Sequence, residues 1–137
     1  METHELKQVV EGVCAGFPSV LAVYLFGSRA KGKPNPKDYD IAALFDEGVL
    51  GSERNIHDET DRLFCALHNH IKPLDLVAFN LAGVRLADEI LRNRVLLYSS
   101  DDLKRKEWEI TKRFMVWDFM PLHERMTDAA INRLLRG

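Results

Sequence analysis

The sequence predicts one α/β (α+β) domain over residues 1–137, a small mixed β-sheet flanked by helices. Segments of helical periodicity alternate with short apolar runs along the chain, and this alternation is typical of sheets covered by helices. The first two predicted strands, 20–26 and 38–45, are joined by a loop too short to hold a crossover helix, which favours a mixed sheet over an all-parallel one. Neither an internal repeat nor an interdomain linker interrupts the pattern.

The first half of the chain begins with a helix and continues with two strands. Apolar residues at helical spacing predict the helix over about 4–16. The nearly continuous apolar run 20–26 predicts a strand that is buried on both faces. Two prolines make 31–37 a loop, and 38–45 follows as the second strand, with Ile41, Ala43 and Phe45 on one face.

The second half repeats the alternation of helix and strand. Residues 52–70 form a predicted amphipathic helix, capped by Ser52 and carrying apolar residues on one side. Pro73 introduces a strand over 74–79. A helix over about 83–93 and a short strand over 95–98 complete the predicted core.

A C-terminal helical segment, about 100–135, follows this core. Ser100-Asp101-Asp102 predicts its start, since a serine is a good N-cap and acids are favoured near the positive end of the helix dipole. Pro121 is expected to kink or end it, with further helix to Leu135. The segment is rich in large apolar side chains, and both core packing and a partner surface explain them. They are Trp108, Phe114, Met115, Trp117, Phe119 and Met120.

Composition and charge exclude several classes of protein. A formal net charge of −2 gives no global bias toward nucleic acid or acidic membranes. The longest apolar runs are shorter than a membrane span, and the N-terminus is acidic and unlike a signal peptide. Cys14 and Cys65 are expected to be buried, reduced thiols. We therefore expect a cytoplasmic protein with no direct contact to nucleic acid or membrane.

Gly27-Ser28, directly after the first strand, is the predicted phosphate end of a nucleotide site. Glycine lets the backbone turn sharply and lets a phosphate approach closely. Amide groups of a short helical turn and the Ser28 hydroxyl are expected to donate to phosphate oxygens. Arg29 and Lys31 add positive charge. An ordinary strand-to-turn junction with solvated basic residues is the alternative interpretation of this segment by itself.

The same segment also satisfies the start of a Walker A loop, G-x-x-x-x-G-K, over residues 27–33. A Walker A loop continues with a serine or threonine and then a helix, whereas Pro34 follows here. We therefore reject a P-loop.

Three aspartates form the predicted metal end of the site. Asp38 and Asp40 are two apart on a strand, so both carboxylates point to the same face. Asp75 lies among apolar residues of a later strand, where an aspartate is disfavoured. A divalent cation relieves the repulsion between converging carboxylates, and Mg²⁺ prefers oxygen ligands. We expect Mg²⁺, as two ions, to bind the triphosphate and to activate the acceptor hydroxyl. Solvated acids at strand ends are the alternative.

The chain resembles the minimal nucleotidyltransferases of the DNA polymerase β superfamily, and within them the MntA-type antitoxins that pair with HEPN-domain toxins of the HepT type. The resemblance rests on Leu25-Phe26-Gly27-Ser28-Arg29-Ala30-Lys31-Gly32, Asp38-Tyr39-Asp40-Ile41 and Leu74-Asp75-Leu76-Val77. It implies a polymerase-β-like fold and Mg²⁺-dependent transfer of AMP from ATP to a tyrosine of the partner toxin. By motif, Gly27 and Ser28 hold the triphosphate, Asp38 and Asp40 hold the metals, and Asp75 completes the metal site and helps to deprotonate the acceptor.

Two other functions stay open at this point. One is an antitoxin that neutralises its partner by masking it, without catalysis. The other is a small-molecule nucleotidyltransferase of the antibiotic-modifying type, although those enzymes usually need an extra helical domain to build the acceptor pocket.

Overall fold

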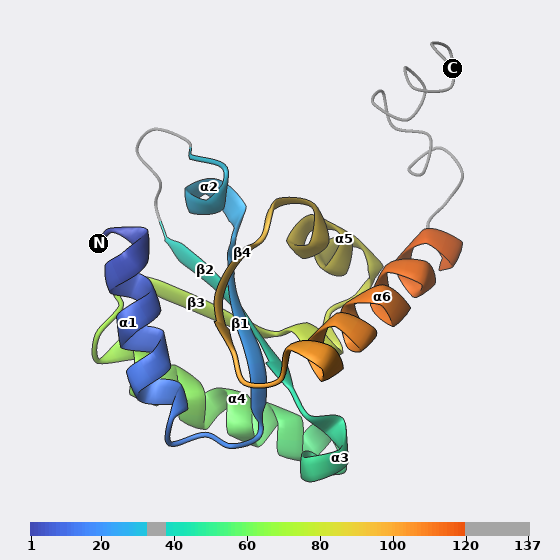
Figure 1. The fold of residues 1–137 in the computed structure, drawn as a ribbon, viewed down its shortest axis with the longest axis horizontal. Coiled ribbons are helices and arrows are strands. Elements are labelled where there is room, and N and C mark those ends of the chain that lie inside the picture. The colour runs from blue at the N-terminus through green and yellow to red at the C-terminus, as the bar shows by residue number, and fades with distance from the viewer. Residues whose placement is uncertain (33–37, 120–137) are drawn as a thin grey trace.

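A computed structural model describes residues 1–32 and 38–119, and Figure 1 shows a central sheet with helices on both of its faces. The strands are β1 (Val20–Phe26), β2 (Tyr39–Phe45), β3 (Leu74–Ala78) and β4 (Val95–Ser99). The helices are α1 (Thr3–Cys14), α2 (Gly27–Ala30), α3 (Glu47–Leu50), α4 (Glu53–His68), α5 (Val84–Asn93) and α6 (Asp102–Phe119), with a 3-10 helix η1 (Phe79–Leu81).

The sheet has the strand order β3-β2-β1-β4. Strand β1 pairs antiparallel with both β2 and β4, and β2 pairs parallel with β3. The predicted mixed sheet is therefore confirmed. Only α2 and residues 31–38 lie between the antiparallel strands β1 and β2 in the sequence, whereas α4 lies on the crossover between the parallel strands, as parallel pairing requires.

The two faces of the sheet are covered by different helices. Val23, Leu25 and Ile41 point to the face packed against α1 and α4. Tyr24 and Ala42 point to the other face, toward α5 and α6. Because side chains alternate along a strand, every even-numbered residue of β2 belongs to the α5/α6 face. This rule places the aspartates discussed below.

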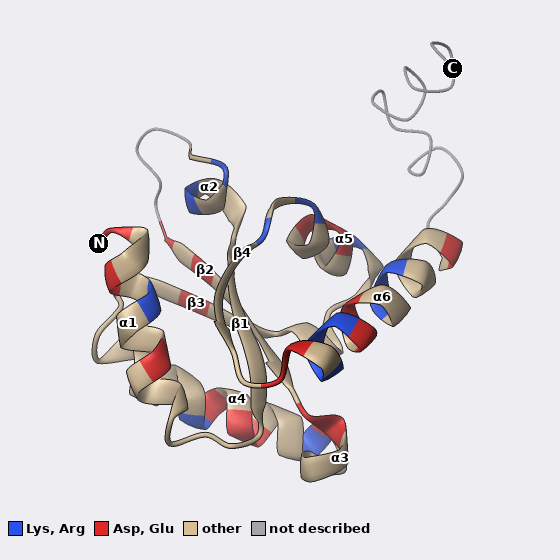
Figure 2. Cartoon of the chain, in the orientation of Figure 1, with Lys and Arg blue, Asp and Glu red and all other residues tan. Residues whose placement is uncertain are grey.

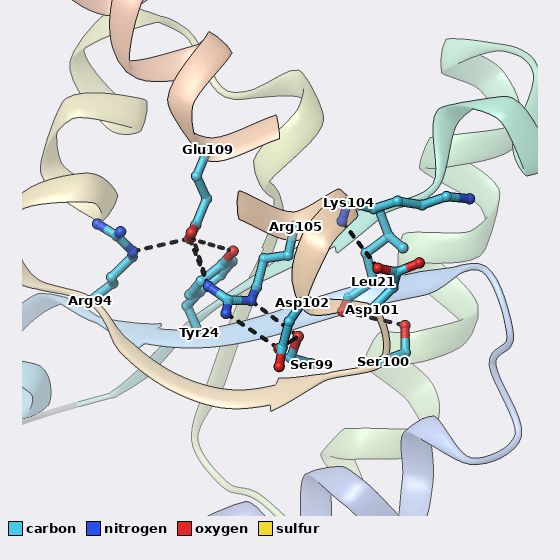
Figure 3. A network of polar contacts seen from close by, with 10 residues as sticks. All are labelled: Leu21, Tyr24, Arg94, Ser99, Ser100, Asp101, Asp102, Lys104, Arg105 and Glu109. Atoms are coloured by element: carbon cyan, nitrogen blue, oxygen red, sulfur yellow. Dashed lines mark hydrogen bonds and ion pairs between the residues drawn. The ribbon is translucent and has the colours of Figure 1, made fainter. Parts of the chain in front are cut away.

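Helix α6 is tied to the sheet by the buried carboxylate of Glu109, which is 6% exposed. Tyr24 Oη donates to it at 3.1 Å, Arg105 Nη1 donates at 2.9 Å, and Arg94 Nε lies 3.4 Å away (Figure 3). The network thus joins β1, the segment after α5, and α6.

Several element ends differ from the predictions. Helix α6 begins at Asp102, and Asp101 Oδ1 accepts the Lys104 amide at 3.1 Å, so Asp101 is the cap. Ser100, predicted as the cap, instead donates to the Val20 carbonyl. The predicted Ser52 cap of α4 is confirmed. Strand β3 ends one residue earlier than predicted, and helix α3, capped by Asp46, was not predicted.

Most of the large apolar side chains of α6 lie on the surface. Trp108 is partly buried and packs edge-on against Phe79, with ring centroids 4.8 Å apart. The exposed ones are Leu103, Ile110, Phe114, Met115, Trp117 and Phe119. Core packing therefore explains few of them. Met120, Pro121 and the predicted helix to Leu135 lie outside the described residues.

The two cysteines differ from each other. Cys14 is buried among core residues, and this burial raises the pKa of its thiol to about 12. Cys65 is exposed on α4, so the prediction that both thiols are buried is wrong for Cys65. Within residues 1–32 and 38–119, no helix has both the length and the apolarity needed to cross a bilayer.

Candidate nucleotidyltransferase site

The predicted phosphate segment lies where β1 ends. Phe26 is the last residue of β1 and pairs with Asp40 of β2. Gly27 begins α2 with a positive φ of 73°, which glycine adopts without strain. Gly27 is buried and Ser28 is half-buried. The predicted helical turn is confirmed, and it is adjacent to the strand that carries the aspartates.

Asp40 and Asp75 are direct neighbours across the parallel pair of β2 and β3. Register partners on parallel strands point to the same face, and for Asp40 this is the α5/α6 face. Figure 2 shows these acidic segments of β2 and β3 at the end of the sheet near α2. Asp38 precedes β2 by one residue and is exposed, Asp75 is exposed, and Asp40 is half-buried. The structure therefore brings Asp40 and Asp75 together, with Asp38 two residues before Asp40 in the chain.

The electrostatics of Asp40 reflect this gathering of acids. Burial raises the pKa of the Asp40 carboxyl above its ordinary value, and the negative charges of Asp75, Asp38 and Glu89 raise it further, in that order. Among the described residues, no lysine or arginine forms an ion pair with Asp38, Asp40 or Asp75. Within the described chain these three acids are thus uncompensated in the sense that no basic side chain pairs with them directly.

Glu89 of α5 is a site residue that sequence reasoning missed. It is exposed, and its charge acts on Asp40 from the helix that covers this face of the sheet. An exposed glutamate on an amphipathic helix is ordinary, so no signal in the sequence distinguishes Glu89 from other surface acids.

Gly27 is in close contact with the carboxylate of Asp40. A Cβ placed on Gly27 would overlap Asp40 Oδ2 and stand only 3.0 Å from Asp40 Cγ. Any side chain at position 27 would thus displace the Asp40 carboxylate. Position 27 therefore requires glycine for two reasons: its φ is positive, and a side chain there would clash with Asp40 of β2.

The two predicted basic ligands differ in their surroundings. The guanidinium of Arg29 lies over the ring of Tyr39, with Cζ 3.6 Å from the ring centroid, and its Nε donates to the Asp38 carbonyl at 3.3 Å. Lys31 is exposed at the end of α2, where its amide donates to the Gly27 carbonyl. Their predicted role in nucleotide binding stays a prediction.

Among the residues of 1–32 and 38–119, no three His, Cys, Asp or Glu side chains are arranged to hold a metal ion by themselves. Mg²⁺ sites that act on phosphates are usually built from one or two carboxylates plus oxygens of the substrate. The neighbouring, uncompensated carboxylates of Asp40 and Asp75 fit such a partial site.

A comparison with protein families matches residues 8–103 to Polymerase beta, Nucleotidyltransferase. The chain belongs to this family. The match confirms the predicted nucleotidyltransferase class and covers α2, β2 and β3, which carry Gly27, Asp40 and Asp75. A comparison with curated proteins gives no match for this nucleotidyltransferase.

Solved structures confirm the fold of this nucleotidyltransferase. A crystal structure of a toxin–antitoxin with AMP-PNP is similar with a TM-score of 0.60 and 19% identity, covering 96% of this chain and 98% of that one. A tri-AMPylated Shewanella oneidensis HEPN toxin in complex with its MNT antitoxin is similar with a TM-score of 0.58 and 18% identity, covering 99% of this chain and 100% of that one. At 18% and 19% sequence identity, these similarities establish the fold and nothing more.

Proposed function

We propose that this nucleotidyltransferase moves AMP from ATP to a tyrosine hydroxyl of a cognate HEPN-type toxin, and thereby acts as its antitoxin. The observation that carries the proposal is the pairing of Asp40 with Asp75 on adjacent strands, beside the turn at Gly27. Membership of the polymerase beta nucleotidyltransferase family supports the reaction class. The similar toxin–antitoxin structures, one with AMP-PNP and one with an AMPylated toxin, support the donor and the partner.

Mg²⁺ fits this site as a cofactor held jointly by the protein and the nucleotide. Asp40 and Asp75, with Asp38 beside them, would supply carboxylate ligands, and triphosphate oxygens would supply others. When bound, Mg²⁺ neutralises the charge that develops on the phosphate oxygens. The uncompensated charge of these aspartates is the physical reason to expect a cation here, because carboxylates that converge repel each other.

The chain's own residues are assigned roles in a single displacement at the α-phosphorus. Gly27, Ser28 and Lys31 hold the triphosphate. The acceptor oxygen bonds to the α-phosphorus as the bond to the bridging α–β oxygen breaks, and pyrophosphate leaves. Asp75, exposed beside Asp40, accepts the acceptor's proton and passes it to solvent.

A partner protein is the favoured source of the acceptor. The described chain has little beyond the sheet and its covering helices with which to enclose a small acceptor. Helix α6 exposes large apolar residues, including Phe114 at 67% and Phe119 at 72%. Aromatic and apolar residues are enriched where proteins associate.

To test the proposal, the purified protein is incubated with its cognate HEPN partner, ATP and Mg²⁺, and the intact mass of the partner is measured by mass spectrometry. The proposal expects the partner to gain the mass of one or more AMP groups on tyrosine and to lose its toxic activity. Omission of the metal is expected to stop the transfer.

Other outcomes distinguish the alternatives. A partner that is inhibited but unmodified would leave only masking. Robust transfer to an aminoglycoside by the isolated chain, with none to the partner, would favour the small-molecule enzyme. Either result would overturn the proposed protein-directed transfer.

A further inference from the structure

We infer that Arg29 is a positioning residue that does not bind the triphosphate itself. It holds the start of β2 so that Asp38 and Asp40 are fixed relative to the predicted phosphate-binding turn at Gly27–Ala30, called the phosphate turn below. The inference rests on the proposed nucleotidyl transfer and deepens it. It comes from the contacts of the guanidinium with the two residues that precede Asp40.

The first observation is that Arg29 joins two parts of the site that are separated in sequence. It follows Gly27 and Ser28 directly on α2. Its Nε donates to the Asp38 carbonyl at 3.3 Å, and its Cζ lies 3.6 Å above the Tyr39 ring. One side chain of the phosphate turn thus holds both residues that lead into Asp40.

The second observation concerns the side of β2 on which the guanidinium lies. Tyr39 is 6% exposed and belongs to the core between the sheet and helices α1 and α4. Asp40 points to the opposite face, where Asp75 and Glu89 act on it. A guanidinium stacked on Tyr39 therefore lies on the face of β2 opposite to the Asp40 carboxylate.

The third observation is how β2 starts. Its first residue, Tyr39, donates its amide to the Pro73 carbonyl at 2.9 Å, next to the start of β3. Arg29 holds the same residue through its ring, which is itself buried. The stacking and the hydrogen bond together fix the backbone on which the carboxylates stand, against their mutual repulsion.

Positioning and phosphate binding predict different kinetics. Loss of a positioning contact displaces the carboxylates, and a displacement of about 1 Å can cost about 10²-fold in rate. We expect Arg29→Ala to lower kcat by about 10- to 100-fold while the KM for ATP stays within about twofold. Lys31→Ala, which removes a proposed phosphate contact two residues along the same turn, is expected to raise the KM for ATP with kcat nearly unchanged.

Tyr39 provides the decisive comparison. Tyr39→Leu removes the ring and is expected to lower kcat as Arg29→Ala does, and the double variant is expected to be no worse than either single variant. Tyr39→Phe keeps the ring and removes only the hydroxyl, which accepts a hydrogen bond from the Met1 amino group at 3.2 Å. Because the contact with Arg29 is through the ring, kcat is expected to stay within about twofold of the wild type. A large rise in KM for Arg29→Ala, with Tyr39→Leu unaffected, would show that Arg29 binds the triphosphate and would overturn the inference.

A binding measurement distinguishes three outcomes: failure of this inference, failure of the proposed function, and a variant that does not fold. Mn²⁺ affinity is measured by electron paramagnetic resonance with a non-hydrolysable ATP analogue, on variants whose urea midpoints are recorded. We expect Arg29→Ala and Tyr39→Leu to weaken Mn²⁺ binding by about tenfold and Tyr39→Phe to leave it unchanged. Unchanged Mn²⁺ affinity in a folded Arg29→Ala variant would overturn the inference. A wild type that binds Mn²⁺ and the analogue but modifies no partner would instead overturn the proposed function.

Discussion

Two carboxylates on the α5/α6 face of the sheet have opposite surroundings. Glu109 is buried, accepts a hydrogen bond from Tyr24, and is paired with Arg94 and Arg105 (Figure 3). Asp40 is half-buried, and the charges that act on it are those of other acids, Asp75, Asp38 and Glu89. Fixed cations compensate the first carboxylate, whereas no described lysine or arginine pairs with the second.

This is the difference expected between a structural carboxylate and the proposed catalytic one. Around Glu109 each polar group has a partner, and burial together with the glutamate charge raises the pKa of Tyr24, so this tyrosine stays a donor. Around Asp40 the fold holds several negative charges close together, and no described basic side chain pairs with them. This repulsion lowers the stability of the folded state, and such a cost is typically retained where the charged groups have a function. The proposed cation, arriving with the nucleotide, would supply the counter-charge.

Asp40→Asn has the largest expected effect and should act on activity alone. Transfer is expected to fall by about 10³-fold, since a ligand worth several kcal/mol in the transition state is lost. The folded-state pKa of Asp40 is raised, so its ionisation lowers stability as pH rises through that pKa. At neutral pH without metal, the melting temperature of Asp40→Asn is therefore expected to be equal or higher. Asp61→Asn, on the exposed surface of α4, is the control for both readouts, and a large loss of stability in Asp40→Asn would make Asp40 structural.

Glu109→Ala should show the opposite behaviour. Removing the buried carboxylate takes the Glu109 ion pair from Arg94 and Arg105, whose side chains are 24% and 11% exposed. Among the described residues, Arg105 then keeps only the exposed Asp102 as an acidic partner, and Arg94 keeps only the Leu91 carbonyl. Breaking a buried pair in this way costs about 3 kcal/mol. Urea unfolding measures the loss, and transfer assayed below the unfolding midpoint is expected to persist. Glu107→Ala, exposed on the same helix, should be nearly neutral; an equal loss there would mean that the Glu109 network does not anchor α6.

Gly27→Ala tests the contact between the phosphate turn and Asp40. Gly32 provides a matched control, because its φ of 68° is similar and no atom of residues 1–32 and 38–119 lies within 4 Å of a Cβ placed there. Both alanine variants are expected to lose about 1 kcal/mol through the positive φ. Only Gly27→Ala also displaces the Asp40 carboxylate, so only this variant should lose transfer activity. Equal behaviour of the two variants in unfolding and transfer assays would contradict the close contact.

The strands and the aspartates could be predicted because both depend on the period-two alternation of side chains. The continuous apolar run 20–26 required burial on both faces, and β1 is buried along its whole length. Asp75 could be singled out because a lone acid is disfavoured in an apolar strand, which indicates a role other than packing. Its position beside Asp40 is consistent with that role.

The rest could not be predicted because it depends on tertiary neighbours. Arg29 beside a phosphate turn indicates a phosphate ligand, and the sequence does not reveal that its guanidinium reaches the ring of Tyr39. Ser100, Asp101 and Asp102 are all able to cap a helix, and the choice of Asp101 follows from the bond that Ser100 makes to Val20. Exposure of Cys65 likewise depends on which face of α4 meets the sheet.

The smallest expected effect is a change in the pKa of Asp40 when a neighbouring acid is removed. Measuring it is the most direct test of the contrast between Asp40 and Glu109. Carbon-13 NMR of the metal-free protein follows the Asp40 carboxyl, whose pKa is raised first by burial and then by Asp75, Asp38 and Glu89. Asp75→Asn is therefore expected to lower the pKa of Asp40 most among single charge removals and Glu89→Gln least, with the value staying above the ordinary one because burial persists. In the wild type, transfer should decline as pH falls through the same pKa, since a protonated carboxyl no longer binds a cation. If Asp75→Asn leaves the Asp40 titration unchanged, the two carboxylates do not share one face, and the contrast with Glu109 loses its physical basis.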